Sequence, residues 1–255
     1  MPATEEWFKE FEFDLPAALL NDLVALFARM SQAPLDSPHV KNIPEEQGVY
    51  QLFLSDQLAY IGKTDSEAGL NKRLTRHARK IWHRTGLAPG QVSFKAVRIF
   101  VFTAVDLEQQ LIRHYEKIEG IKLAWNHSGF GANDPGRERD TSKLKENHFD
   151  LVYPIDIDAT LVKFPIKGEF SIAEVLSTLK AAVPYTLRFQ NAGGSKKPHP
   201  DLVSTKVTIP SGKLDARRIL RLVQIALGST WQVTKLPGYV IVYKESKLYP
   251  HSMPL

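Results

Sequence analysis

Near the start of the chain, apolar side chains recur at the spacing of an amphipathic helix. These positions are Leu15, Leu19, Leu23, Leu26 and Phe27. Asp14 with Pro16 is typical of a helix start, because aspartate caps the free amides and proline is tolerated in the first turn. We expect this helix to end before a loop at residues 32–44. Its apolar face is expected to pack on this chain, the alternative being a second subunit.

From Gly48 the pattern changes to short apolar runs. Runs at 49–54 and 58–61 flank a polar turn at 55–57, which predicts a β-hairpin.

A helix, a strand and a second helix are predicted after the hairpin. Residues 69–84 have helical spacing, and residues 92–102 are rich in β-branched and aromatic side chains. The second helix is expected after Thr103, because Thr103 and Asp106 have the spacing of a capping box. The order β-β-α-β-α predicts an α+β module, a small three-stranded antiparallel sheet flanked by helices.

The rest of the chain predicts a long loop and then a second α+β domain. Residues 128–150 are rich in Gly, Asn, Asp, Arg and Lys and form the loop. Two similar halves follow, separated by a polar stretch at 191–201, with helices at 172–182 and 214–227 and extended segments at 185–189 and 231–243. We therefore divide the chain into a helical segment (1–46), a first module with its loop (47–153) and an accessory domain (154–255) that binds DNA or protein.

Composition excludes several classes of protein. Of the 255 residues, 43% are hydrophobic and 24% charged, which argues against disorder over the whole length. No apolar stretch approaches the ~18 residues of a membrane span, and the N-terminus is acidic rather than a basic lead into an apolar core. The chain has no cysteine, which excludes disulfides, thiolate zinc sites and cysteine nucleophiles. We expect a cytoplasmic protein with no membrane partner.

Charge is unevenly distributed along the chain. Residues 1–47 have three Lys or Arg against nine Asp or Glu, whereas residues 48–153 have sixteen against twelve. Residues 154–255 have fourteen against seven. A basic body behind an acidic leader points to a polyanionic partner, the alternative being a basic protein without a particular partner.

The predicted helix at 69–84 combines an apolar stripe with a cationic one. The apolar stripe consists of Leu70, Leu74, Ala78 and Ile81, and the neighbouring stripe, expected to face outward, consists of Arg73, His77, Lys80 and Arg84. Residues 63–84 contain seven Lys or Arg and two Asp or Glu, enough to neutralise several phosphates. The alternative is an ordinary solvated helix face.

The second helix offers a carboxylate. Leu107, Leu111 and Ile118 mark its expected buried side, and Glu108 lies at the edge of that side. A carboxylate near a basic helix can hold Mg²⁺, which prefers oxygen ligands and keeps several waters. The alternatives are a surface carboxylate or an ion pair with Arg73.

Short motifs on these elements together resemble the GIY-YIG nuclease superfamily over about residues 47–127. They are Gly48-Val49-Tyr50 and Tyr60-Ile61-Gly62 on the two hairpin strands, Arg73 with His77, Glu108, and finally Asn126. Each motif alone is weak, since tyrosines are common on strands and usually pack. Their order and placement carry the resemblance.

The resemblance implies a metal-dependent DNA endonuclease that uses Mg²⁺ or Mn²⁺. It assigns Tyr50, Tyr60, Arg73, His77 and Glu108 to catalysis, with Glu108 as the metal ligand. Tyr50 is expected to take a proton from the attacking water with help from His77, provided that adjacent cations make its own proton more labile, while Arg73 stabilises the phosphate oxygens. Substrate-binding residues in the first module are expected to be Gly62, Lys63, Lys80, Arg84 and Asn126, of which Asn126 braces the site through hydrogen bonds.

Two further details resemble a restriction-endonuclease branch of the superfamily. They are the Arg73 and His77 spacing and the segment Gly129-Phe130-Gly131 followed by Asn133-Asp134-Pro135-Gly136. The chain departs from that branch in lacking an insertion between the two tyrosines, in the longer interval from Glu108 to Asn126 and in the extra C-terminal domain. A restriction or anti-phage defence nuclease is the leading hypothesis. A structure-specific repair nuclease and a non-catalytic DNA-binding or adaptor protein on a GIY-YIG fold are the alternatives.

The predicted C-terminal helix at 214–227 adds cations. Arg217 and Arg221, with Gln224, form an expected exposed stripe that could contact DNA, the alternative being a plain surface helix. Because two strands need two hydrolyses, we expect a homodimer on duplex DNA. The C-terminal domain could also bind a protein partner.

Overall fold

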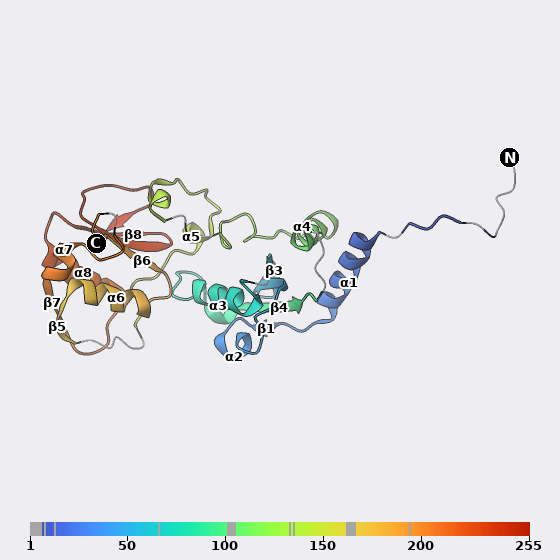
Figure 1. The fold of residues 1–255 in the computed structure, drawn as a ribbon, viewed down its shortest axis with the longest axis horizontal. Helices are drawn as coiled ribbons and strands as arrows, with labels where there is room; N and C mark the ends of the chain where they lie inside the picture. The colour runs from blue at the N-terminus through green and yellow to red at the C-terminus, as the bar shows by residue number, and fades with distance from the viewer. Residues whose placement is uncertain are drawn as a thin grey trace.

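The computed structural model describes most of the chain as two lobes that lie side by side (Figure 1). The described residues are Trp7, 9–12, 14–65, 67–100, 106–132, 134, 136–161, 167–193 and 195–255. We call residues 7–153 the N-terminal lobe and residues 154–255 the C-terminal lobe. Both mix helices with small sheets, so the predicted α+β class is confirmed. No described helix is long and apolar enough to cross a membrane.

The N-terminal lobe is built on an antiparallel sheet in the order β1-β4-β2-β3 among the described strands. The strands are β1 (Ala33–Pro34), β2 (Gly48–Leu54), β3 (Gln57–Thr64) and β4 (Val92–Arg98). The helices are α1 (Leu15–Arg29), α2 (Ser37–Val40), α3 (Leu70–Lys80) and α4 (Leu107–Arg113), and the 3₁₀ turn η1 spans Pro89–Gln91. The hairpin and its partner strand were predicted, whereas β1 was missed because two residues give no periodicity.

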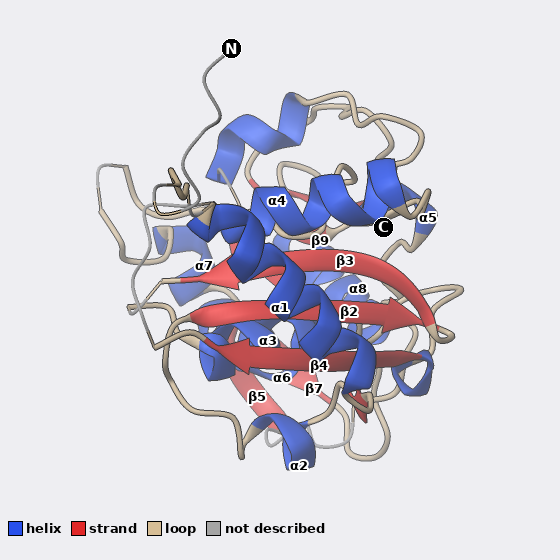
Figure 2. Cartoon of the chain, turned by 90° about the vertical axis from the view of Figure 1, so that its right-hand side faces the viewer, coloured by secondary structure: helices blue, strands red, loops and turns tan. Residues whose placement is uncertain are grey.

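Helices cover both faces of this sheet. Leu23 and Phe27 of α1 pack with α4 on one face, so α1 packs on its own chain as expected (Figure 2). Leu70 and Leu74 of α3 pack on the other face with Tyr50. Tyr50 therefore points toward α3, which makes that face the one that matters for the site.

Several predicted boundaries differ from the observed ones. Helix α3 ends at Lys80 rather than at residue 84. His83 has a left-handed backbone conformation with a φ of +49°, which a continuing helix does not allow. Helix α4 begins at Leu107, and its N-cap is Asp106, whose side chain accepts from the backbone N–H of Gln109 at 3.2 Å. Strand β4 was predicted to reach residue 102 and ends at Arg98. Thr103 lies outside the described residues.

The expected buried side of the second helix is wrong at one position. Leu107 and Leu111 are buried, but Ile118 is 75% exposed. The reason is the π-helical turn η2 (His114–Ile118), which adds a residue to the turn and shifts the helical phase. Tyr115 is buried in its place.

The C-terminal lobe contains a sheet in the order β10-β8-β9-β6, with β6 parallel to β9, and a separate antiparallel pair, β5 with β7, among its described residues. The strands are β5 (Gly168–Ser171), β6 (Thr186–Phe189), β7 (Lys206–Ile209), β8 (Gln232–Leu236), β9 (Tyr239–Tyr243) and β10 (Met253–Pro254). The helices are α6 (Ile172–Ala182), α7 (Pro200–Ser204) and α8 (Ala216–Leu227). The prediction placed α6 correctly and missed the short elements β5, α7, β7 and β10.

The predicted loop at 128–150 contains two short elements and joins the lobes. They are the 3₁₀ helix η3 (Gly136–Thr141) and the helix α5 (Phe149–Val152). Backbone hydrogen bonds connect the lobes directly, from Thr85 N to Pro154 O at 2.9 Å and from Asp156 N to His83 O at 2.8 Å. The end of α3 is therefore fixed against the C-terminal lobe.

Candidate active site

The centre of the candidate site is a pair formed by Tyr50 and His77. Tyr50 lies on β2 and His77 on α3, and the Tyr50 hydroxyl and His77 Nε2 are hydrogen-bonded at 2.7 Å. Tyr60, on β3, completes a cluster of three rings, with centroids 6.1 Å from Tyr50 and 5.6 Å from His77. The two strand tyrosines and the helical histidine of the motifs are thus brought together.

The sheet register explains why Gly62 belongs to this cluster. Gly62 lies directly opposite Tyr50 in the antiparallel pairing of β2 with β3. A Cβ at Gly62 would clash with the Tyr50 hydroxyl and with the Tyr60 ring. The glycine therefore makes room for the tyrosine side chains, and its contribution is steric.

Gly62→Ala should consequently destabilise the fold and displace Tyr50. Overpacking of this kind costs about 1–3 kcal/mol in unfolding free energy. Thermal denaturation of the variant, with Gly90→Ala as control because a Cβ there meets nothing within 4 Å, measures the effect. Equal melting temperatures for the two variants would contradict this steric role.

Burial keeps both partners of the central pair neutral. Tyr50 is fully buried, and burial raises its pKa although Arg73 pulls in the opposite direction. Burial also lowers the pKa of His77 well below its usual value, and Arg73, Arg76 and Lys80 lower it further. Adjacent cations were expected to make the Tyr50 proton more labile. Arg73 does lower the pKa of Tyr50, but desolvation raises it by more, so the net pKa is raised and the expectation is wrong.

Arg73 and Glu108 lie at the more exposed edge of the cluster. Both are half-buried, and the field of Glu108 raises the pKa of Tyr50 and of Tyr60, while Arg73 lowers both. Arg73 Nε is buried and has no hydrogen-bond partner among the described residues. The Arg73 side chain is also hydrogen-bonded to Tyr50, so the guanidinium lies against the tyrosine pair.

Glu108 stands in the first turn of α4, beside the end of β3. Burial raises its pKa, opposed by Lys63 and Arg73 and by a hydrogen bond from the Lys63 backbone. Within the described part of the chain no ion pair of Glu108 is found, whereas its neighbour Asp106 pairs with Lys63 at 3.0 Å. The Lys63 pair is about half-exposed and hence weak, so its ammonium can exchange partners.

The outward orientation predicted for one stripe of α3 is wrong for two of its four members. The apolar stripe is buried as expected, but His77 is also buried and Arg84 nearly so. The loop that follows Trp125 packs over this stripe, and Phe130 stacks on His77 with centroids 4.8 Å apart. Glycines flank this phenylalanine for a physical reason, since a Cβ at Gly131 would clash with the Tyr60 hydroxyl.

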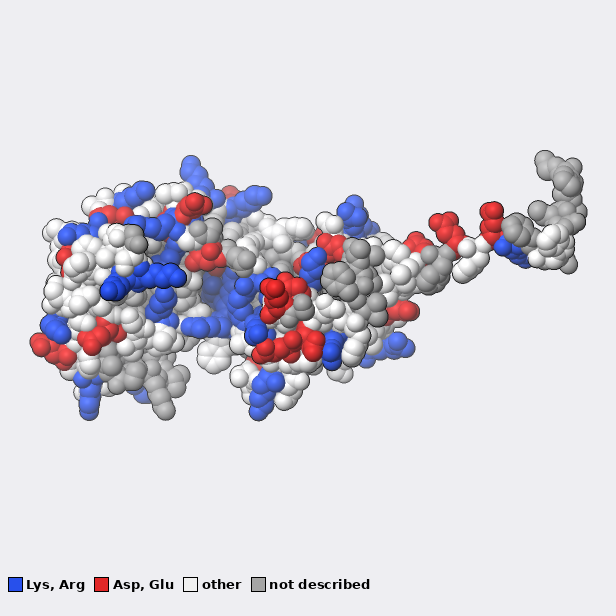
Figure 3. Space-filling view, in the orientation of Figure 1, with Lys and Arg blue, Asp and Glu red and all other residues white. Residues whose placement is uncertain are grey.

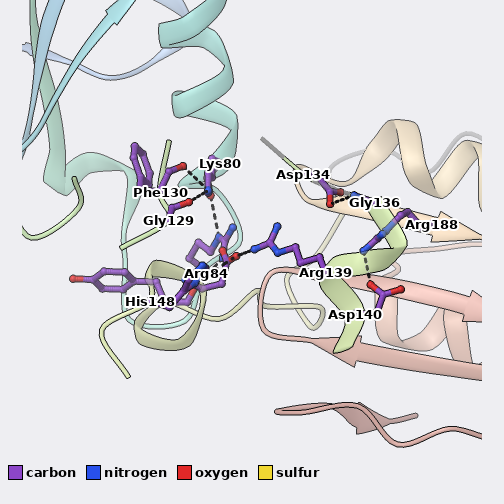
Figure 4. Close-up of polar contacts among 12 residues, drawn as sticks. Lys80, Arg84, Gly129, Phe130, Asp134, Gly136, Arg139, Asp140, His148 and Arg188 are labelled. Atoms are coloured by element: carbon purple, nitrogen blue, oxygen red, sulfur yellow. Dashed lines mark hydrogen bonds and ion pairs between the residues drawn. The ribbon is translucent and has the colours of Figure 1, made fainter. Parts of the chain in front are cut away.

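Lys80 and Arg84 hold the loop in place (Figure 4). Lys80 Nζ donates to the carbonyls of Gly129 at 3.3 Å and Phe130 at 2.5 Å, and burial lowers its pKa to about 8. Arg84 donates to the Asp150 carboxylate at 2.8 Å and to the Tyr153 carbonyl at 2.9 Å. The buried Arg84 guanidinium is therefore occupied by partners within the fold, and its expected role in substrate binding stays a prediction.

Asn126 has the bracing contacts that were expected of it. Its amide oxygen accepts from Ile61 N at 2.9 Å and its amide nitrogen donates to Ile61 O at 2.8 Å. Since β3 is an edge strand, this side chain takes the place of a neighbouring strand at that position. Asn126 thereby fixes the strand between Tyr60 and Gly62.

The candidate cations of α8 lie in the C-terminal lobe and are differently engaged. Arg217 donates two hydrogen bonds to the Asp158 carboxylate, at 2.5 and 3.0 Å. Its guanidinium is therefore engaged in an ion pair within the C-terminal lobe. Arg221 is exposed. Gln224 is half-buried rather than exposed, because it accepts from Val233 N and donates to Trp231 O.

Sequence reasoning missed the residues that enclose the site. Phe130 was noticed only as part of a motif, and Trp125, whose ring centroid is 4.7 Å from that of Phe130, gave no signal. The buried acid Asp150 was also missed, although it receives hydrogen bonds from Arg84 and Arg139. Each contact joins segments far apart in the sequence, which no local pattern reveals.

Comparison with known proteins adds no relative. No family model matches the sequence, and no curated protein matches it.

The donor set is suited to a hard cation held mainly by water and substrate. The described residues include no group of three or more His, Cys, Asp or Glu that could enclose a metal ion. Mg²⁺ is commonly bound through one or two carboxylates and substrate phosphates, with waters completing its shell. The half-buried Glu108 carboxylate, free of an ion pair among the described residues, fits this mode of binding.

Proposed function

We propose that this protein is a metal-dependent DNA endonuclease of the GIY-YIG type, which hydrolyses phosphodiester bonds. The observation that supports the proposal is the convergence of β2, β3, α3 and α4 on one cluster of Tyr50, Tyr60, Arg73, His77 and Glu108. Those are the groups that phosphodiester hydrolysis requires: a proton relay, a cation for the phosphate and a carboxylate for a metal.

In this proposal each side chain has a distinct task. Arg73 binds the non-bridging oxygens of the scissile phosphate through its half-buried guanidinium, beside Tyr50 and Tyr60. Glu108 holds Mg²⁺ or Mn²⁺, which when bound supplies Lewis-acid stabilisation to the leaving 3′ oxygen. Tyr60 and Lys63 orient the phosphate.

Tyr50 and His77 form the proton relay. The Tyr50 hydroxyl accepts a proton from the attacking water and passes its own to His77 Nε2, along the 2.7 Å hydrogen bond. A concerted transfer avoids a stable tyrosinate and leaves the proton on His77 as an imidazolium, and burial disfavours both charges. The relay requires a local opening of the site, since Tyr50 is fully buried.

The biological role that we propose is restriction or another form of anti-phage defence, in the cytoplasm. The motif Gly129-Phe130-Gly131 supports it, because its members contact His77 and Tyr60 at the candidate site and also resemble a restriction branch. We propose that the protein acts on duplex DNA as a homodimer, one site for each strand.

The complete burial of Tyr50 favours one second candidate. A tyrosine that is sealed in a core and bonded to a neutral histidine can be purely structural. The protein would then be a DNA-binding or adaptor protein on the same fold, which binds DNA and does not cut it.

Incubation of the purified protein with plasmid and phage DNA tests the proposal. We expect discrete fragments on a gel with Mg²⁺, and none with EDTA. Fragments that persist in EDTA would contradict metal dependence. DNA that is bound, in a mobility-shift assay, but intact at every Mg²⁺ and Mn²⁺ concentration would favour the non-catalytic candidate.

A further inference from the structure

A basic cleft lies between the two lobes, next to the candidate site. Its volume is about 670 Å³, and it is lined by α3, by η3 with the segment before it, and by the C-terminal end of α6 with the start of β6. In Figure 3, Lys and Arg side chains gather in the hollow between the lobes. The lobes thus jointly form a concave surface on which positive charge predominates.

The cleft has an excess of cations. Among its described lining residues, the acids are Asp134 and Asp150, and the bases are Arg76, Arg79, Lys80, Arg84, Arg139 and Lys180. Asp150 is occupied by Arg84 and Arg139 (Figure 4). The negative charge of Asp150 is therefore balanced by these two arginines within the wall of the cleft.

Three of the other bases, Arg79, Lys80 and Lys180, contact neutral partners within the described part of the chain. Arg79 donates to the Val183 carbonyl at 2.7 Å, and Lys80 donates to the carbonyls of the Phe130 loop, which are neutral acceptors. Lys180 is exposed, with its ammonium 5.9 Å from the Phe189 ring centroid. Cations that line one hollow raise one another's free energy, and an anion that enters relieves this repulsion.

The cleft continues into the candidate site. Arg76 lines the cleft, precedes His77 in the chain and lowers the pKa of Tyr60. Phe130 likewise lines the cleft with one side while it stacks on His77. A chain of phosphates that reaches Arg73 therefore passes Arg76 on its way along α3.

We propose that the interlobe cleft binds the sugar-phosphate backbone of the DNA flanking the scissile bond, with α3 and α6 as its two walls. The inference rests on the proposed function, which makes DNA the substrate, and it assigns to the C-terminal lobe a direct part in holding that substrate. Repeating phosphates suit this row of cations better than a single small anion does, because the cations extend from α3 across to α6.

Fluorescence anisotropy with a labelled DNA duplex in EDTA tests this assignment separately from cleavage. The variant is Arg76→Gln with Lys180→Gln, one exposed cation from each wall. The control is Arg29→Gln with Lys206→Gln, one exposed cation from each lobe outside the cleft. Loss of two phosphate contacts should weaken binding by about 30-fold at 0.1 M salt and lower the salt-dependence slope by about 2.

The outcomes separate the cleft from the chemistry. Binding that falls in the cleft variant and not in the control supports the cleft, even if the wild-type protein cleaves no DNA and the endonuclease proposal fails. Equal binding by both variants overturns the cleft, even if wild-type cleavage stands. A wild-type protein that binds no duplex also overturns it. The single variant Lys180→Glu is tested for DNA binding as well, and its melting temperature shows whether it is folded. We expect it to fold, because this side chain makes no described hydrogen bond.

Discussion

Glu108→Ala should abolish Mg²⁺-dependent cleavage and leave DNA binding in EDTA unchanged. The carboxylate is half-buried beside Arg73 and Lys63, and no other described acid lies at the site without an ion pair, since Asp106 is paired with Lys63. Loss of the metal ligand removes charge stabilisation in the transition state, for which we expect a fall in cleavage rate of at least ~10³-fold. Single-turnover cleavage of a linear duplex measures it.

The variant Glu108→Gln and a control on the same segment sharpen this prediction. Glutamine retains the size and loses the charge, so it should be as inactive as alanine if the carboxylate binds a metal. Glu116→Ala should cleave normally, because Glu116 pairs with His127, away from the tyrosine cluster. Normal turnover by Glu108→Ala would refute the assigned role.

The same carboxylate predicts how cleavage depends on pH. Burial raises the pKa of Glu108 above its ordinary value, and only the ionised form binds a cation. As the pH falls through this raised pKa, the required form is lost, so activity should decline at a higher pH than an exposed glutamate would impose. Raising the Mg²⁺ concentration should shift the decline to lower pH.

Local patterns were sufficient for the elements that hold the candidate site. The hairpin signal gave β2 and β3, whereas the pairing of Gly62 with Tyr50 also depends on a one-residue register shift between Leu52 and Phe53 that the signal does not reveal. The apolar stripe of α3 was correct at each of its four positions because burial against a sheet imposes a helical period. Local periodicity therefore accounts for Tyr50 and Tyr60 on the sheet face that α3 covers.

Long-range contacts decided what local patterns could not. His77 and Arg84 have the helical phase of an outward stripe, yet both are buried, because Phe130 and Asp150 approach from a later segment. Such a cover converts a polar helix face into an internal one, and a sequence holds no periodic signal for it. Arg217 illustrates the same limit, since its partner Asp158 lies 59 residues away.

The buried ion pair at the junction of the lobes should dominate the response of stability to mutation. Arg84 and Asp150 are 2.8 Å apart with side chains 3% and 2% exposed, and Arg139 also donates to Asp150. Gly238 of the β8–β9 turn lies against the same carboxylate, so the pair sits where the lobes meet. Asp150→Ala leaves the buried Arg84 and the half-buried Arg139 without a counter-charge, which should cost about 3–5 kcal/mol of unfolding free energy.

Thermal melting of Asp150→Ala, with Asp158→Ala as control, measures this cost. Asp158 pairs with Arg217, and the Asp158 side chain is 58% exposed. Loss of this pair should therefore cost no more than about 1 kcal/mol. A cost of 3–5 kcal/mol corresponds to a fall in melting temperature of about 10 °C for a chain of this size. Similar melting temperatures for the two variants would show that the buried pair contributes no more than an exposed one.

The pH dependence of this stability has a definite sign. Burial raises the pKa of Asp150, but Arg84, Lys80 and Arg139 together outweigh it, and the net pKa lies below the ordinary value of 3.8. A carboxyl whose pKa is lower in the folded state stabilises the fold above its unfolded pKa and loses that effect as the pH falls through its folded pKa. The difference in unfolding free energy between wild type and Asp150→Asn should therefore be constant near neutral pH and shrink below pH ~4. A difference that grows on acidification would mean that Asp150 is protonated in the folded protein, and that Arg84 is held by the carbonyl of Tyr153 rather than by the charge of Asp150.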